Sequence, residues 1–277
     1  MPRPTPSQLR PVTSSQNALV KELRRAFQRS ELTADGHAAI EGVRTIEEAI
    51  RSGLRMKAVF FSEAAQARAE ALLPQLSKHA ETLLLPDKVF ESAVATETPQ
   101  GVAALVKVRE FKLPDVLKAS YEAPVLVTVG IQDPGNLGTL LRSAEALGAA
   151  GVLLTEGTVS LYNSKTVRAS AGSMFRLPAI RVASEQAIQE LRGHGLSLVG
   201  TTSHGGIPLD EASLTGSVAI FLGNEGAGLP KTMLRQMDTL VEIPHAGKVE
   251  SLNAAVAGSI VLYEAARQRR AEMSVET

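Results

Sequence analysis

Cysteine is absent from the 277 residues of this chain. Its absence excludes disulfides, cysteine-ligated zinc or iron–sulfur sites, and any covalent cysteine mechanism. No apolar run approaches the ~20 residues that a membrane-spanning helix needs. The first residues, MPRPTPSQLRP, lack the apolar segment of a secretory signal. Together these absences predict a soluble, cytoplasmic protein that has no membrane partner.

Common catalytic signatures are also missing. The chain has no Walker A motif, no H-E-x-x-H and no nucleophile elbow, and its five histidines lack metal-ligand spacing, so we expect no metal site. The segment GNEGAGLP (223–230) has glycines in the order G-x-x-G-x-G, whereas a dinucleotide fingerprint needs G-x-G-x-x-G. Glu242 is predicted to lie inside the next strand and not at its carboxyl end. A nicotinamide-dependent dehydrogenase is therefore disfavoured.

Charge is balanced overall but not along the chain. The formal net charge is zero, which argues weakly against nucleic-acid binding. The first thirty residues nevertheless carry one acid, Glu22, against a set of basic residues: Arg3, Arg10, Lys21, Arg24, Arg25 and Arg29. Such a segment can contact phosphates. A solvated tail and helix face explain the same charges.

The apolar pattern divides the chain into two α/β regions. We expect a flexible amino terminus (1–14), a small α/β domain (15–108), a polar linker (109–123) and a larger α/β domain (124–277). The hydrophobic content of 44% is enough for buried cores. Strands alternate with helices at a spacing that implies βαβ crossovers and a mostly parallel sheet covered on both faces. Expected strands are 57–61, 82–85, 101–108, 125–131, 151–155, 179–182, 196–202, 218–223 and 239–243; expected helices are 15–30, 43–52, 63–73, 87–94, 137–147, 163–171, 184–192 and 251–270.

Three polar, glycine-containing loops follow strand-like runs of the second region. In an open parallel sheet, ligands bind at the carboxyl ends of the strands. Taken singly, the polar side chains have plain structural roles. Asn136 suits a helix N-cap, Arg142 a surface ion pair, Glu225 a solvated turn, and Asn253 local hydrogen bonds. Taken together, they predict one site made from the loops at 131–143, 223–230 and 243–253.

The last helix has a predicted start and an unusual face. Ser251 occupies the position expected of an N-cap. Ala254, Ala255, Ala257 and Gly258 allow very close packing. Packing in the core and a helix–helix dimer interface explain these small residues equally well.

Three motifs in the second region carry a resemblance to a known family. They are NLGTLLRSA (136–144), IFLGNEGAGL (220–229) and IPHAGKVESLNAAVA (243–257). In order and spacing they resemble the SpoU (TrmH-like) branch of the SPOUT RNA methyltransferases. Residues 16–108 resemble the family's amino-terminal substrate-binding domain, through GHAAIEG (36–42) and TPQGVAA (98–104).

The resemblance implies a fold, an activity and an assembly. The fold is α/β: a mostly parallel sheet domain with a deep trefoil knot, preceded by a smaller α/β substrate-binding domain. The activity is transfer of a methyl group from S-adenosyl-L-methionine to a ribose 2′-hydroxyl in RNA. Ribosomal RNA is favoured over transfer RNA because the separate first domain resembles those of rRNA-modifying members. The assembly is a homodimer whose last helices pack together and share the substrate site.

The resemblance also assigns residues. The cofactor-binding positions that it implies are Thr201, Gly223, Ile243, Ser251 and Leu252. The catalytic positions are Asn136, Arg142, Glu225, Ser251 and Asn253. A guanidinium is a poor base because its pKa exceeds ~12, so we expect Arg142 to clamp the adjacent phosphate and lower the pKa of the hydroxyl.

The other positions have supporting roles in this interpretation. Asn136 is expected to orient the ribose or Arg142. Glu225 is expected to pair with Arg142 or to accept the proton through water, and Ser251 and Asn253 to bind the hydroxyl or the cofactor. The competing hypotheses are an inactive RNA-binding module of the same fold and a tRNA 2′-O-methyltransferase.

Overall fold

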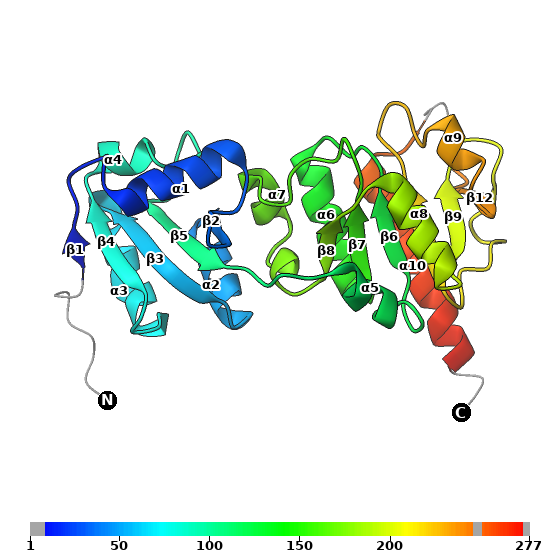
Figure 1. Cartoon of the computed structure of the whole chain (residues 1–277), viewed down its shortest axis with the longest axis horizontal. Coiled ribbons are helices and arrows are strands. Elements are labelled where there is room, and N and C mark those ends of the chain that lie inside the picture. Colours follow the sequence, from blue (N-terminus) through cyan, green and yellow to red (C-terminus); the bar gives the residue numbers. More distant parts are fainter. Residues whose placement is uncertain (1–8, 246–250, 274–277) are drawn as a thin grey trace. The chain divides into compact units, whose positions relative to one another are not determined.

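The structure of the chain is a computed structural model that describes residues 9–245 and 251–273. The chain forms two compact units (Figure 1). The first contains the residues up to Glu110 together with Ser160–Arg176, and the second contains Phe111–Val159 and the residues from Leu177 onward. The chain therefore leaves the second unit after Val159 and returns to it at Leu177.

The first unit holds a five-stranded sheet in the order β1-β4-β3-β5-β2. Strand β5 runs antiparallel to both β3 and β2, while β4 is parallel to β3 and to β1. Its elements are β1 (Arg10–Pro11), α1 (Ala18–Arg29), β2 (His37–Glu41), α2 (Val43–Arg51), β3 (Arg55–Ser62), α3 (Gln66–Leu72), β4 (Glu81–Leu85), α4 (Asp87–Glu91), β5 (Val102–Lys107) and α7 (Ser164–Ala169), with 3₁₀ turns at Glu63–Ala65, Leu73–Gln75 and Ser173–Phe175.

Helix α1 covers one face of this sheet. Its apolar side chains recur at helical spacing, so Val20, Leu23 and Phe27 all point inward and are buried. They pack in one cluster with residues such as Phe60 of β3 and Leu105 of β5. The polar residues of α1 are left on the outer side of the helix.

The second unit holds a seven-stranded sheet in the order β10-β12-β9-β11-β6-β7-β8, and every pairing in it is parallel. Its elements are α5 (Leu113–Ala119), β6 (Val125–Thr128), α6 (Pro134–Ala146), β7 (Gly151–Leu154), β8 (Ala179–Arg181), α8 (Ser184–Gly193), β9 (Ser197–Thr201), β10 (Ile207–Pro208), β11 (Val218–Leu222), α9 (Lys231–Leu234), β12 (Thr239–Glu242) and α10 (Ala254–Met273).

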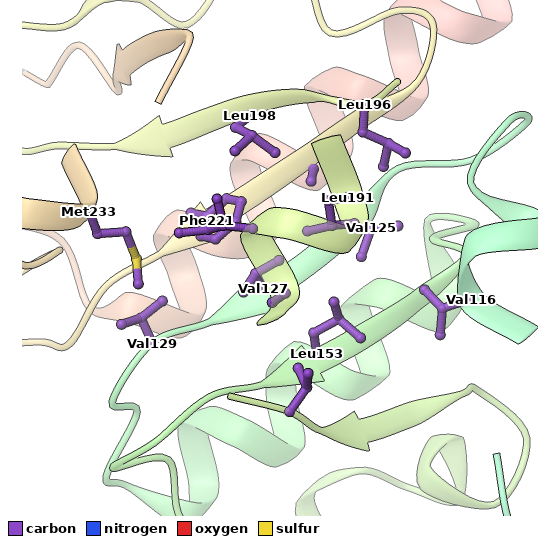
Figure 2. Close-up of a cluster of buried hydrophobic side chains, with 14 of the residues drawn as sticks. Val116, Val125, Val127, Val129, Leu153, Leu191, Leu196, Leu198, Phe221 and Met233 are labelled. Atoms are coloured by element: carbon purple, nitrogen blue, oxygen red, sulfur yellow. The ribbon is translucent and has the colours of Figure 1, made fainter. Parts of the chain in front are cut away.

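Helices cover both faces of the second sheet. On one face, α5, α8 and α9 pack on a cluster that includes Val127, Leu153 and Phe221 (Figure 2). On the other face, α10 packs against α6, and a side chain at Gly258 would collide with Leu140 of α6 and Leu222 of β11. The small residues of α10 therefore serve packing inside the chain.

Several expected elements differ from the structure. Part of the segment expected to be flexible (1–14) forms β1, which pairs with β4; residues 1–8 of that segment lie outside the described residues. The segment expected to be a linker contains α5, whose Val116 and Leu117 are buried in the second unit's core. The short elements β2, β10 and α9 were not expected, and α10 begins at Ala254 instead of residue 251.

Within residues 9–245 and 251–273, no helix combines the length and apolar character needed to cross a membrane.

Candidate active site

A pocket lies where the carboxyl ends of three neighbouring strands meet. Because all strands of the second sheet run the same way, the loops that follow β9, β11 and β12 emerge at one edge. They enclose a cavity of about 240 Å³ together with the start of α10. All five positions expected to bind a cofactor line it: Thr201, Gly223, Ile243, Ser251 and Leu252.

The pocket combines apolar walls with a polar loop. Leu222, Leu229 and Val241 contribute apolar side chains, while Thr202, Ser203 and the loop at 223–228 contribute polar groups and backbone. The hydroxyl of Thr201 donates to the carbonyl of Phe221 at 3.1 Å. Residues 246–250, which include the predicted glycine loop at 246–247, lie outside the described residues.

Gly223 is required by the protein's own backbone. A Cβ at this position would lie 2.2 Å from the carbonyl carbon of Gly228 and 2.4 Å from the amide nitrogen of Leu229. The loop therefore folds back against itself at a residue that has no side chain. The structure therefore explains this glycine by contact between two parts of the backbone, and not by contact with a ligand.

A chain of hydrogen bonds joins three of the predicted catalytic residues. The Nδ2 of Asn136 donates to Oε1 of Glu225 at 2.7 Å, and the Nδ2 of Asn253 donates to Oδ1 of Asn136 at 3.0 Å. Each residue comes from a different motif, and they lie on α6, the loop after β11 and the start of α10. The amide of Asn136 thus connects all three loops of the predicted site.

Glu225 therefore has a different partner from the one expected. We expected Glu225 either to pair with Arg142 or to accept the proton through water, and in the structure Glu225 accepts a hydrogen bond from Asn136. Arg142 is exposed on α6, and no described residue forms a hydrogen bond or ion pair with its guanidinium. The expected ion pair is absent, and the positive charge of Arg142 has no counter-ion among the residues that the structure describes.

Two helix caps also differ from the expected assignments. Asp133 caps α6 by accepting from the amide of Asn136 at 2.8 Å, so the side chain of Asn136 is available for other bonds. Asn253, and not Ser251, caps α10, since its Oδ1 accepts from the amides of Ala255 and Val256 at 2.9 and 3.2 Å. Ser251 is exposed at the pocket.

Glu242 is the last residue of β12, at the carboxyl end of the strand, and the expectation that it lies inside the strand is wrong. Its Oε2 accepts from the amide of Gly206 at 3.1 Å. A carboxylate that binds a neighbouring loop in this way is not presented to a ribose. A dinucleotide site is still disfavoured, because the glycine order is wrong and because Glu242 already bonds to the loop at Gly206.

Comparison with known proteins places both units. The profile of the SpoU rRNA Methylase family matches residues 123–263, and that of the MRM3-like substrate binding domain matches residues 17–104. The chain is 34% identical to the 23S rRNA (guanosine(2553)-2'-O)-methyltransferase RlmP of Bacillus subtilis, over 92% of this chain and 98% of that protein.

Two further proteins extend the similarity. The 23S rRNA (uridine(2479)-2'-O)-methyltransferase of Streptomyces viridochromogenes is 32% identical, over 87% of this chain and 86% of that protein. The crystal structure of the AdoMet-bound rRNA methyltransferase from Sinorhizobium meliloti superposes with a TM-score of 0.77 at 30% identity, covering 94% of this chain and 98% of that one. Because the family profile spans more than half of the chain and includes every predicted site residue, this protein belongs to the SpoU rRNA methylase family.

Proposed function

We propose that this protein transfers a methyl group from S-adenosyl-L-methionine to a ribose 2′-hydroxyl of ribosomal RNA. The observation that carries the proposal is that the second and third family motifs line one pocket, while Asn136 of the first motif is joined by hydrogen bonds to Glu225 and Asn253. The similar proteins from B. subtilis and S. viridochromogenes act on 23S rRNA, one at a guanosine and one at a uridine. The base next to the target ribose therefore does not follow from the similarity.

The pocket suits S-adenosyl-L-methionine chemically. The apolar walls of Leu222, Leu229 and Val241 match an adenine ring, and the polar groups of Thr201 and Ser251 match the hydroxyls and the amino-acid end. The absence of a side chain at Gly223 keeps the wall formed by the loop at 223–228 intact. When bound, the cofactor supplies an electrophilic methyl group on a sulfonium.

The residues of the chain perform the remaining tasks. The exposed guanidinium of Arg142 is free to hold the phosphate next to the target nucleotide, and its charge lowers the pKa of the 2′-hydroxyl. Asn136 fixes Glu225 through Oε1, so that Oε2 can take the proton through a water molecule. Ser251 lines the pocket and Asn253 bonds to Asn136, and in this proposal the ribose and the cofactor meet between them.

We further propose that the protein is a homodimer through α10. Val256 is 48% exposed and Tyr263 is 53% exposed, seven residues apart on the side of α10 that does not face the core. Ser259 of the same helix bonds to Ser143, the neighbour of Arg142, at 2.7 Å. A partner helix on this face would therefore lie beside Arg142, which supports a substrate site shared between two copies.

We propose the knot and the location on the basis of the family. Members of this family thread the carboxyl-terminal segment as a trefoil knot, and the close packing of α10 on α6 and β11 agrees with that path. We propose a cytoplasmic location, where ribosomal RNA is available for modification.

Methyl transfer with a tritiated cofactor tests the activity, and mapping 2′-O-methyl sites in total RNA from cells with and without the gene identifies the target. We expect one site in 23S rRNA to lose its methyl group when the gene is deleted. A lost site in a transfer RNA would replace the substrate assignment. Cofactor binding and RNA binding without any transfer would identify an inactive RNA-binding module.

A further inference from the structure

Asn224 lies between Gly223 and Glu225, and both ends of its carboxamide are in use. Its Oδ1 accepts from the amides of Gly226 and Ala227 at 2.9 and 3.3 Å. Its Nδ2 donates to the carbonyl of Gly130 at 2.7 Å. The side chain thus bonds within its own loop and to a loop 94 residues earlier in the chain.

The two ends act on different parts of the site. The Oδ1 bonds, with the backbone bond from the amide of Gly228 to the carbonyl of Asn224 at 2.9 Å, fold the loop that lines the pocket. The Nδ2 bond fixes the loop after β6, which continues directly into α6 and Asn136. Gly130 has φ of 67°, a left-handed conformation that suits glycine.

The Nδ2 bond and the bond between Asn136 and Glu225 both measure 2.7 Å and both end on the loop after β11. The first comes from the loop after β6, and the second comes from the start of α6, which follows that loop. If the carbonyl of Gly130 were released, the backbone bond from Val129 to Leu222 and the side-chain bond from Asn136 to Glu225 would remain between these segments. The position of Asn136 relative to Glu225 would then lose one of its constraints. A misplacement of about 1 Å in a reacting group costs on the order of 100-fold in rate.

We propose that Asn224 is a positioning residue with two separable functions. Its Oδ1 shapes the wall that faces the cofactor, and its Nδ2 holds Asn136 in line with Glu225 for transfer. This proposal rests on the proposed function, because it assigns Asn224 to the same reaction. The simpler explanation is a turn residue, for which only the acceptor matters.

Asn224→Asp separates these explanations because aspartate keeps the acceptor oxygen and loses the donor. We expect S-adenosylhomocysteine affinity, measured by calorimetry, to stay within about 3-fold of wild type, while kcat for methyl transfer falls by about 10–100-fold. Asn224→Ala removes both ends. It should weaken S-adenosylhomocysteine binding by about 10-fold or more and speed amide hydrogen exchange at 226–228. Asn17→Asp makes the same chemical change at the N-cap of α1. It should alter neither the S-adenosylhomocysteine affinity nor kcat.

A double-mutant cycle with Asn136→Ala adds a second criterion. If both residues act through one alignment, their effects on kcat will be less than additive. Wild-type kcat in Asn224→Asp, or an equal loss of kcat and of S-adenosylhomocysteine affinity, would overturn the proposal. Failure of the wild-type protein to bind S-adenosylhomocysteine would instead refute the proposed function, and hydrogen exchange in Asn224→Ala would still show whether the side chain holds the loop.

Discussion

A charged cluster in the first unit and the predicted site in the second unit use charge differently. In the first unit, Lys57 bonds to both Glu22 and Asp35 at 2.7 and 2.8 Å. The pKa of the Asp35 carboxyl lies well below its usual range because Lys57 and Thr33 donate hydrogen bonds to it. In the second unit, the predicted site is joined by neutral amides, and Arg142 has no partner among the described residues.

This difference indicates which charges are structural and which are available for a substrate. A compensated charge stabilises its own unit modestly when it is exposed. An exposed guanidinium that has no partner is solvated by water and stays available to bind an anionic group of a substrate. One row of cations in the first unit is unpaired among the described residues, as Arg142 is, whereas Lys57 is paired. Lys21, Arg25 and Arg29 are exposed at four-residue spacing along α1 and lack a described partner.

The largest expected effect is at Arg142. Arg142→Ala should lower methyl transfer by about 10²–10³-fold, the order seen when a charge-stabilising donor is lost, with S-adenosylhomocysteine affinity nearly unchanged. Arg142→Lys should also fail, because an ammonium cannot reproduce the bidentate fork. Arg235→Ala, at an exposed arginine of the same unit, is the control for charge alone. Normal turnover in Arg142→Ala would remove this residue from the mechanism.

The next effect concerns the pocket wall. Gly223→Val should lower S-adenosylhomocysteine affinity by about 100-fold, or ~3 kcal/mol, because the backbone at Gly228 must move away. Gly226→Ala is a matched control, since a Cβ there would meet only Asn224 at 3.6 Å. Calorimetric titration of both variants measures the contrast. Equal affinities for the two variants would show that the loop has space that the structure does not indicate.

The boundary between the units gives a third test. A chain that starts at 118 loses buried Val116 and Leu117 of α5, each worth ~2–5 kcal/mol when truncated in a core. A chain that starts at Phe111 keeps α5 and should melt at a higher temperature while still binding S-adenosylhomocysteine. Both should methylate RNA poorly if the first unit supplies the RNA affinity. Transfer at the full-length rate by the Phe111 chain would refute that division of labour.

The smallest effect is on RNA affinity. Charge reversal of Lys21, Arg25 or Arg29 should each reduce the slope of log affinity against log salt by about 0.7–0.9, as expected for one lost phosphate contact. Lys78→Glu changes the same charge at an exposed residue elsewhere in the unit and should leave the slope near the wild-type value. An identical slope in all four variants would show that α1 does not contact RNA.

Arg24 belongs in a different class from its neighbours on α1. Its Nε donates to the carbonyl of Ser92 at 2.8 Å and its guanidinium also bonds the hydroxyl of Ser92 at 3.0 Å. The sequence alone places Arg24 and Arg25 together in one basic segment that can contact phosphates. The structure separates them, because the bonds of Arg24 hold α1 against the residue that follows α4.

The sequence predicted the second sheet better than the first. Val-, Ile- and Leu-rich runs such as VAIFL and VLVT are typical of buried parallel strands, and the structure contains them as β11 and β6. Strand β2 (HAAIE) was missed because alanine and glutamate are weak strand formers, and its pairing with β5 overrides that preference. Helix α5 was interpreted as a linker because its apolar face is only three residues wide.

The loops of the candidate site could be predicted from the sequence, but the hydrogen bonds between them could not. Glycine and polar residues after apolar runs identified the loops. The start of α6 could also have been found, since Asp133 followed by Pro134 is a common N-cap and first-turn pair. The bond between Asn136 and Glu225 joins residues 89 positions apart. A single sequence contains no signal for such a pair, and so Arg142 was given a partner that belongs to Asn136.

The passage of Ser160–Arg176 through the first unit has a consequence for synthesis on the ribosome. When Glu110 has been made, the first unit still lacks the segment Ser160–Arg176. In that segment Arg176 bonds Glu48 of α2 and Ser52 at the end of that helix, and Arg168 bonds Thr96. A further 66 residues (176 minus 110) must be translated before that segment is complete. At ~5–20 residues per second this is a delay of roughly 3–13 s. The first unit is therefore still incomplete when its first 110 residues have been made, and it can finish folding only after Arg176 has been translated, when Phe111–Val159 of the second unit has already been made.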